Sequence, residues 1–276
     1  MAQVKSQWSA RVLCPACLPD LPFTELMVLA RTHGFTAFSL WQSVPASARA
    51  AGLSDADMRG LLADHGLRVE MLEAAIDWVN AGSERDVVVR TESLARTARS
   101  LGATSLCAAA MEPAINDPRQ AGRNFAQICK VAADHGLCVA LEALAFGAIN
   151  HLDIAREIVD RAGCDNGGFL FDTWHWARTG ADMAALRRLP AERIYNVQIS
   201  DLGPSESLSG MEETMQCRRL PGEGTAPLAE VFSVLQDMGV HCSIGPEVFN
   251  PGLKAGSPEE GARMLAAAAR AVVPGW

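Results

Sequence analysis

The feature that most restricts the fold is a recurring unit in which an amphipathic helix ends in Gly and runs directly into a short β-prone stretch. The unit occurs in HGFTAFSL, HGLRVEML, LGATSLCA, HGLCVALE, AGCDNGGFLF and MGVHCSIG, with glycines at positions 34, 66, 102, 136, 163 and 239. Glycine tolerates the left-handed conformation that closes a helix. Each unit therefore predicts a helix end followed by a strand.

The spacing of these glycines predicts eight strands. The last interval is about two units long, and we place the turn of the extra unit at residues 190–193. A first strand is expected at Arg11–Cys14. Helices are expected at residues 22–33, 54–65, 84–101, 117–135, 150–162, 182–189, 227–238 and 258–273.

Eight successive β-then-α units favour an α/β fold, a single-domain (β/α)₈ TIM barrel over residues 1–276. The alternative is an open, doubly wound sheet, which usually has fewer units. A hydrophobic content of 49% is ample for such a core. We interpret the long stretch at about 201–227 as an active-site loop and not as a domain boundary.

The net charge and the N-terminal segment limit which partners the chain is expected to have. The net charge of −8 repels phosphate backbones and anionic membranes, so we expect neither nucleic acid nor membrane as a partner. The N-terminal segment lacks a basic stretch followed by a long apolar run, which indicates a cytoplasmic protein. A homo-oligomer is compatible with the sequence. Eight cysteines are scattered along the chain, and Cys14 and Cys17 have no second pair to complete a zinc site.

Polar residues follow four apolar strand segments, where a barrel gathers its catalytic groups. Strand five (CVAL) ends in Glu142, strand six (GFLF) in Asp172, strand seven (IYNV) in Gln198 and strand eight (CSIG) near Glu247. Converging carboxylates repel each other unless they are protonated or bind a cation. Three anionic oxygens and an amide oxygen suit one hard divalent metal ion, Mn²⁺ first, with Mg²⁺ or Co²⁺ possible. The alternative is that single members pair with an arginine or cap a helix.

Other residues near these strand ends are candidates for chemistry. His175 follows Asp172 by three positions in DTWHW and is expected to carry protons or support the ligands, the alternative being a structural histidine. Trp174 and Phe146 are expected to wall a small ring, although loop aromatics often serve packing. Arg218, in the RRLPGEG stretch, is expected to bind a substrate oxygen or acid group.

Several chemistries are excluded by missing residues. Lysine occurs only at 5, 130 and 254, away from strand ends, so a Schiff-base aldolase has no nucleophile. GxSxG, P-loop and HExxH motifs are absent. Histidines 33, 65 and 135 each precede a helix-terminating Gly and are interpreted as helix caps, not as metal ligands.

The motifs LEALAFG, FDTWHWARTG, VQISD, RRLPGEG and GPEVFN resemble those of the xylose isomerase-like barrel superfamily, a group of sugar isomerases and epimerases that includes inosose-processing enzymes and 3-dehydroshikimate dehydratases. The resemblance covers nearly the whole chain. It implies a single metal held by Glu, Asp, His or Gln, and Glu, which correspond here to Glu142, Asp172, Gln198 and Glu247. Two departures stand out: many family epimerases have His at the position of Gln198, and ketose epimerases have a second Glu where this chain has Ala148.

The resemblance and the ligand set together predict a metal-dependent isomerase or epimerase of a sugar or related polyhydroxy carbonyl compound. Proton abstraction by Glu142 and Glu247 is expected to pass through a metal-bound enediolate, with His175 nearby. A dehydratase of the 3-dehydroshikimate or inosose type is the first alternative. A non-catalytic sugar-binding barrel is the second, and an apurinic endonuclease is disfavoured because it needs more histidine ligands and a basic face.

Overall fold

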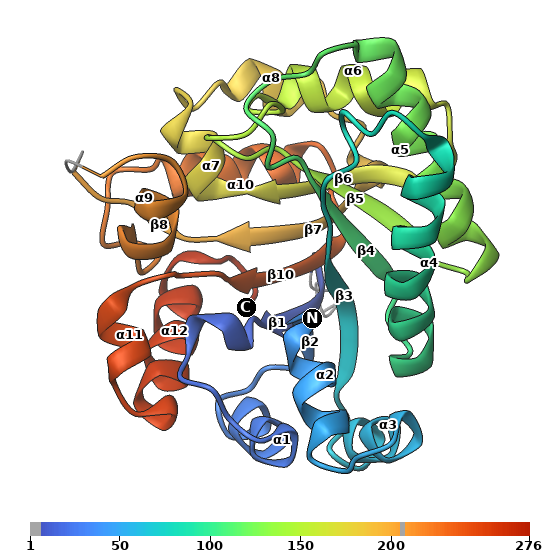
Figure 1. Ribbon diagram of the computed structural model, residues 1–276. Helices are drawn as coiled ribbons and strands as arrows, with labels where there is room; N and C mark the ends of the chain where they lie inside the picture. Colours follow the sequence, from blue (N-terminus) through green and yellow to red (C-terminus); the bar gives the residue numbers. More distant parts are fainter. Residues whose placement is uncertain (1–6, 205–207) are drawn as a thin grey trace.

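Eight parallel strands close into a barrel in the computed structural model, which describes residues 7–204 and 208–276 (Figure 1). Around the barrel the strands follow the order of the chain, and the last pairs with the first. They are β1 (Trp8–Leu13), β2 (Ala37–Trp41), β3 (Arg68–Ala75), β4 (Ser105–Ala109), β5 (Cys138–Glu142), β6 (Gly167–Asp172), β7 (Ile194–Ile199) and β10 (Cys242–Pro246). The predicted (β/α)₈ barrel is confirmed, and the open sheet is wrong.

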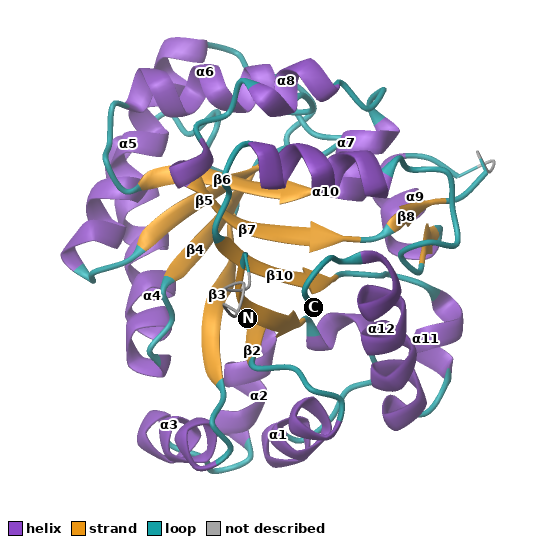
Figure 2. Ribbon diagram, turned by 180° about the vertical axis from the view of Figure 1, so that it is seen from behind, coloured by secondary structure: helices purple, strands orange, loops and turns teal. Residues whose placement is uncertain are grey.

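Helices surround the barrel on its outside (Figure 2). Those that match the eight predicted spans are α1 (Phe23–Thr32), α3 (Asp55–Asp64), α4 (Glu84–Leu101), α5 (Pro118–Asp134), α6 (Leu152–Ala162), α8 (Met183–Arg187), α10 (Leu228–Asp237) and α12 (Pro258–Val272). Shorter helices that the sequence analysis did not anticipate are α2 (Ser43–Ala50), α7 (Thr173–Arg178), α9 (Gly210–Gln216) and α11 (Pro251–Ala255), with 3₁₀ turns η1 (Pro15–Cys17) and η2 (Ala191–Arg193).

The helix-ending glycines have the backbone conformation that the sequence predicted. Gly102 and Gly163 end α4 and α6 with φ of 73° and 64°, in the left-handed region. The other four glycines of the recurring unit also have positive φ. His33, His65 and His135 occupy the C-cap positions of α1, α3 and α5, which confirms their interpretation as caps.

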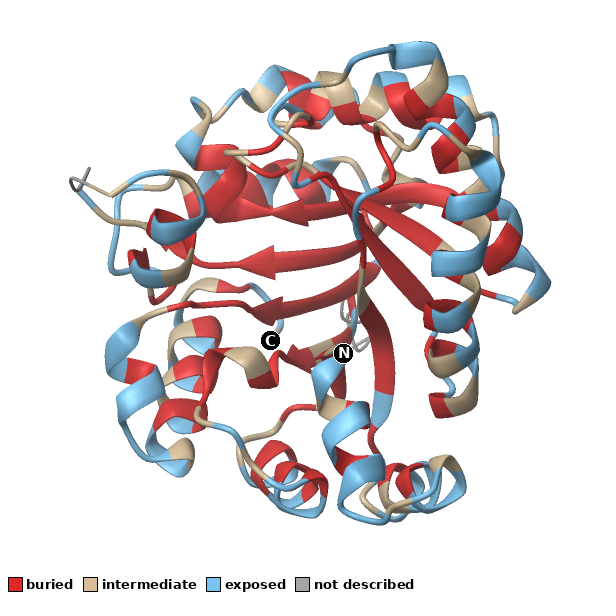
Figure 3. Ribbon diagram, viewed as in Figure 1, coloured by how far each residue is buried: buried red, intermediate tan, exposed pale blue. Residues whose placement is uncertain are grey.

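The strands are almost entirely buried, while the helices alternate buried inner faces with exposed outer faces (Figure 3). This pattern is expected of a parallel sheet whose faces are covered by helices and barrel-filling side chains. Register aligns the strand ends: Asp172 pairs with Gln198, Gln198 with Gly245, and Ala109 with Glu142. Side chains at these ends therefore open onto the same rim of the barrel.

The stretch at 201–227, predicted as an active-site loop, contains regular structure. β8 (Asp201–Leu202) pairs antiparallel with β9 (Arg218–Arg219), and α9 lies between them in the chain. This ribbon lies beyond the ends toward which the arrows of β7 and β10 point (Figure 1). The buried Asp201 carboxylate accepts hydrogen bonds from the backbone N–H groups of Leu202, Gly222 and Ala226. One carboxylate thus ties the start of β8 to the C-terminal part of the RRLPGEG segment and to Ala226.

Among the residues that the structure describes, no helix combines the length and the apolar character needed to cross a membrane.

Candidate functional site

The four predicted metal ligands lie at one rim of the barrel, and each is between 3 and 7% exposed. Glu142 and Asp172 are the last residues of β5 and β6, Gln198 is the next-to-last of β7, and Glu247 directly follows β10. Their side chains fall into two groups. Ligand atoms of Glu142, Asp172 and His175 lie within 4.8 Å of one another, as do those of Glu247 with Glu73 and Cys14.

Arg218 lies between these two groups. Its Nη1 atom donates to Asp172 Oδ2 at 2.7 Å and to Glu247 Oε2 at 3.3 Å, and it also donates to the Glu247 backbone carbonyl at 3.2 Å. The guanidinium stacks against Trp174 and Phe249, with its carbon 5.3 and 4.8 Å from the ring centroids. Arg218 therefore joins two predicted metal ligands, and its expected role in binding a substrate oxygen or acid group stays a prediction.

Gln198 links the second group. Its amide nitrogen donates to Glu247 Oε1 at 2.9 Å and to Glu73 Oε1 at 3.2 Å. Its amide oxygen is buried and has no hydrogen-bond partner. Because a buried acceptor without a partner is costly, this oxygen is a candidate ligand atom.

His175 is fixed by the first turn of α7. The Asp172 carboxylate accepts a hydrogen bond from the His175 backbone N–H at 2.9 Å and so caps this helix. The ring Nδ1 accepts from the Ala145 backbone N–H at 3.1 Å, and Nε2 lies 3.8 Å from Glu142 Oε1 and 3.1 Å from Arg218 Nη2. Burial, followed by the charge of Arg218, lowers the pKa of His175 to about 3, against the opposing effect of Asp172. The ring is therefore neutral at neutral pH.

The pKa values of the carboxyl groups in this site are shifted in opposite directions. Burial, and then the charges of Asp172 and Glu73, raise the pKa of Glu142 well above its usual value. Burial and the charge of Glu73 do the same for Glu247. Burial opposes ionisation of Asp172, but the charge of Arg218 and the hydrogen bonds from the His175 backbone and the Arg218 side chain, acting together, outweigh burial and lower the pKa of Asp172. Like charges held in a low-dielectric site produce this separation of protonation behaviour.

The donor set fits a divalent cation. Four carboxyl groups, those of Glu73, Glu142, Asp172 and Glu247, face one permanent cation, Arg218, among the described residues of the site. His175 contributes no charge because its ring is neutral. Carboxyl groups therefore outnumber cations in the site, and the Gln198 amide adds an oxygen without a hydrogen-bond partner. Hard divalent metals bind oxygen donors of these kinds.

Aromatic rings border the site. The Phe146 and Trp174 rings lie 5.8 and 5.1 Å from the His175 ring, each edge to face. The Trp174 indole nitrogen is buried without a hydrogen-bond partner. Both rings lie beside His175, and their role as a wall for a substrate stays a prediction. Trp174 adds a donor that no described protein group uses.

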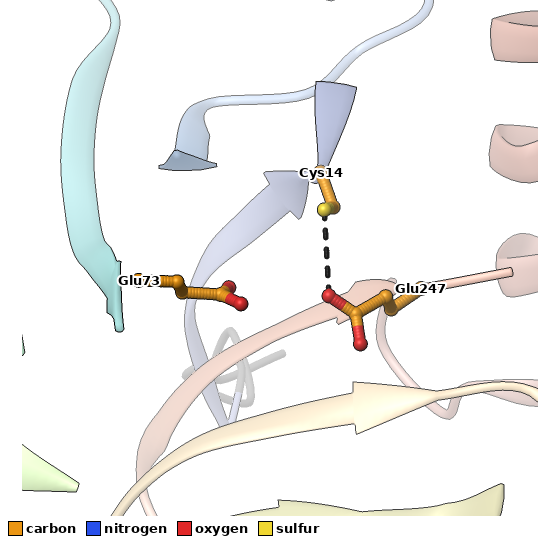
Figure 4. Close-up of side chains that lie close together, drawn as sticks. All are labelled: Cys14, Glu73 and Glu247. Atoms are coloured by element: carbon orange, nitrogen blue, oxygen red, sulfur yellow. Dashed lines mark hydrogen bonds between the residues drawn. The ribbon is translucent and has the colours of Figure 1, made fainter. Parts of the chain in front are cut away.

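Sequence reasoning missed Glu73, Cys14 and Cys107. Glu73 lies near the end of β3, and Cys14 follows β1 directly (Figure 4). The Cys14 thiol donates to Glu247 Oε1 at 3.4 Å, and the Cys107 thiol donates to Glu142 Oε2 at 3.7 Å. Glu73 carried a readable signal, since MLEA repeats the apolar-then-Glu pattern of ALEA around Glu142.

The sequence of the chain is similar to those of known proteins. A sequence profile of the family described as xylose isomerase-like TIM barrel matches residues 27–271. The chain is 29% identical over 207 residues to a 3-dehydroshikimate dehydratase of Pseudomonas aeruginosa, a match that covers 73% of this chain and 32% of the dehydratase. The chain therefore spans about a third of the length of that relative.

A second relative matches over most of both proteins. The chain is 23% identical over 208 residues to an inosose isomerase of Bacillus velezensis, covering 71% of this chain and 72% of the isomerase. Among solved structures, the IOLI protein with a bound zinc atom superposes with a TM-score of 0.86 at 18% identity, covering 96% of this chain and 98% of that one. At this identity the superposition shows a shared fold.

Proposed function

Because the chain belongs to the xylose isomerase-like TIM barrel family, we propose that it is a divalent-metal-dependent isomerase or epimerase of a sugar or related polyhydroxy carbonyl compound. The family resemblance predicted from the motifs is confirmed, and the named relatives are an isomerase and a dehydratase. The observation that carries the proposal is the gathering of buried acid groups at the catalytic rim, together with a buried Gln198 amide oxygen that has no hydrogen-bond partner.

Glu142, Asp172, Gln198 and Glu247 are the residues we propose to hold the metal. Each is buried and offers an oxygen at the same rim. A bound divalent ion, Mn²⁺ in our proposal, supplies Lewis acidity that polarises a substrate carbonyl and acidifies the neighbouring C–H. The excess of carboxyl groups over cations supports this assignment, because a divalent ion offsets their mutual repulsion.

Proton transfer is assigned to Glu142 and Glu247. They belong to two different groups of the rim, and we assign them to opposite faces of the substrate carbon. In an epimerase one group removes the proton and the other delivers a proton to the opposite face. His175 Nε2, which faces Glu142, is placed to move a proton to or from a substrate oxygen.

Substrate binding is assigned to Trp174, Phe146 and Arg218. The Trp174 ring packs against the sugar, and its unpartnered N–H donates to a hydroxyl. Arg218 binds an oxygen of the substrate near the proposed metal, consistent with its contacts to Asp172 and Glu247.

A dehydratase is the second candidate, favoured by the similarity to a 3-dehydroshikimate dehydratase and by Gln198, which is reminiscent of dehydratase-like family members. In that reaction a carboxylate removes the proton next to the carbonyl, and the β-hydroxyl leaves as water after receiving a proton from His175 or a neighbouring acid. The same residues serve both reactions, and the fate of the substrate hydroxyl decides between them.

Deuterium exchange tests the proposal. The manganese-loaded protein is incubated in D₂O with ketoses, inososes and 3-dehydroshikimate, while mass and ultraviolet absorbance are followed. Deuterium uptake without a new chromophore supports an isomerase or epimerase, and a conjugated product supports the dehydratase. Glu142→Gln should abolish either signal, whereas Glu157→Gln on exposed α6 should not. Neither signal from a protein that binds manganese and sugars would indicate a binding barrel instead.

A further inference from the structure

Glu73 is a carboxylate of the site that the proposed mechanism does not use. It enters from β3, which β4 separates from the strand of Glu142, and its carboxylate points toward Glu247 (Figure 4). Ser39 Oγ donates to its Oε1 atom, and the Trp41 side chain hydrogen-bonds the same carboxylate. Glu73 is therefore held in place by β2, its neighbour in the barrel.

The contact of Glu73 with Gln198 determines which end of the amide faces the carboxylates. The Gln198 nitrogen lies 3.2 Å from Glu73 Oε1 and 2.9 Å from Glu247 Oε1. Both carboxylate oxygens accept a hydrogen bond from this nitrogen, so the amide presents its N–H₂ group to the pair. The amide oxygen is then directed away from both carboxylates, and it is the atom left without a partner.

We infer that Glu73 is a positioning residue that holds the Gln198 amide with its oxygen directed to the metal. This inference rests on the proposed function, which makes Gln198 a metal ligand. Glu247 also accepts from the amide, but Glu247 is itself a proposed ligand, so its oxygens would also be needed to hold the ion. Glu73 is then the acceptor that continues to orient the amide, as outer groups commonly orient metal ligands.

Because the proposed ligand is the amide of Gln198, a neighbouring group such as Glu73 is needed to fix its orientation. An amide has a donor end and an acceptor end of nearly the same shape, so rotation by half a turn replaces the ligand oxygen with an N–H₂ group. A histidine ligand has no such ambiguity between an oxygen and an amino group. A carboxylate acceptor next to the amide nitrogen removes the wrong rotamer.

Two conservative variants separate position from charge. Glu73→Asp keeps the charge but withdraws the acceptor by one methylene, while Glu73→Gln removes the charge and keeps an acceptor oxygen at the same reach. Calorimetric titration with Mn²⁺ at fixed pH should give a Kd about tenfold weaker for Glu73→Asp and within about threefold of wild type for Glu73→Gln. In the Gln198→His background, Glu73→Asp should cost less than about threefold.

Circular dichroism melts confirm that each variant is folded before titration. Glu70→Asp makes the same change three residues earlier on β3, where the carboxylate contacts Arg68 and Thr104 instead, and should leave the Kd unchanged. A weaker Kd for Glu73→Gln with a normal Kd for Glu73→Asp would overturn the inference in favour of a charge effect. Wild-type Kd values in both variants would also overturn it while leaving the proposed function intact. No Mn²⁺ binding by wild type would instead refute the proposed function, and the inference with it.

Discussion

Arg218 is the positively charged residue that pairs with the buried carboxyl groups of the site. It is 1% exposed and donates to Asp172 and Glu247, so it partly offsets the repulsion of the surrounding carboxyl groups. A buried cation of this kind is costly to remove when its partners stay behind unpaired. Its stacking on Trp174 and Phe249 also fixes the guanidinium in one plane.

Arg218→Met tests this role. We expect the metal-free variant to lose about 3–5 kcal/mol of unfolding free energy in urea titrations with EDTA, because Asp172 and Glu247 are left buried without their cation. Arg188→Met removes an exposed ion pair with Asp153 and should cost less than about 1 kcal/mol. Equal losses in the two variants would show that Arg218 does not compensate the buried acids.

Trp174→Phe tests the proposed donor to the substrate. The ring remains but the unpartnered N–H is lost, so KM should rise by about five- to thirtyfold with little change in kcat. The control is Trp176→Phe, because the Trp176 indole donates to the Asp182 carbonyl at 3.2 Å and serves the fold. An unchanged KM in Trp174→Phe would remove Trp174 from the binding site.

For single residues, the sequence predicted which ones lie at the rim but not all the residues that they contact. Glu142, Asp172, Gln198 and Glu247 follow apolar strands, and this pattern was sufficient to expect them at one rim. Glu73 has the same pattern, yet a contact between β3 and β7 across the barrel cannot be read from local sequence. The contacts of Cys14 and Cys107 with carboxylates could not be predicted either, because cysteine spacing says nothing about a neighbouring carboxylate.

The β8–β9 ribbon is the element that carries Arg218 to the site. Asp201 is the first residue of β8. Its carboxylate accepts hydrogen bonds from the backbone N–H groups of Leu202 in β8 and of Gly222 and Ala226, which follow β9. Gly224 packs so closely that an added Cβ would lie 2.4 Å from the Leu202 carbonyl oxygen and 2.5 Å from the Asp201 carboxylate. The ribbon is thus a fixed support for Arg218 and not an unstructured loop.

Asp201→Ala should loosen this element. Three backbone donors lose their acceptor, so we expect faster hydrogen exchange over residues 218–226 and a loss of about 1–3 kcal/mol of stability. Asp182→Ala removes a single cap hydrogen bond at α8 and should cost about 1 kcal/mol without affecting that segment. Unchanged exchange at 218–226 in Asp201→Ala would show that Asp201 does not hold the ribbon.

Long helices were predictable and short elements were not, for a physical reason. The helices around the barrel have an apolar stripe and clear end signals, such as Gly102 and the Ser257 cap of α12, so their spans were found within a few residues. By contrast, α7 and α9 have six and seven residues, too few for a periodic stripe. They depend on tertiary contacts such as the Arg178–Glu213 ion pair between them.

For the whole molecule, barrel closure is what gives the polar strand ends a common location. β10 pairs with both β7 and β1, which brings the residues after the last strand beside those after the first. The contact between Glu247 and Cys14, 233 residues apart, is a direct result. Repeating units predicted this topology, whereas the orientation of each rim side chain depends on packing among strands distant in sequence.

Anomalous scattering from crystals grown with Mn²⁺ tests the account most directly. We predict one strong peak at the rim, bound by oxygens of Glu142, Asp172, Gln198 and Glu247 at about 2.0–2.4 Å. Removal of manganese with EDTA should abolish the peak while the barrel is retained. A peak that lacks two or more of these four residues, or no peak at saturating Mn²⁺, would contradict the account.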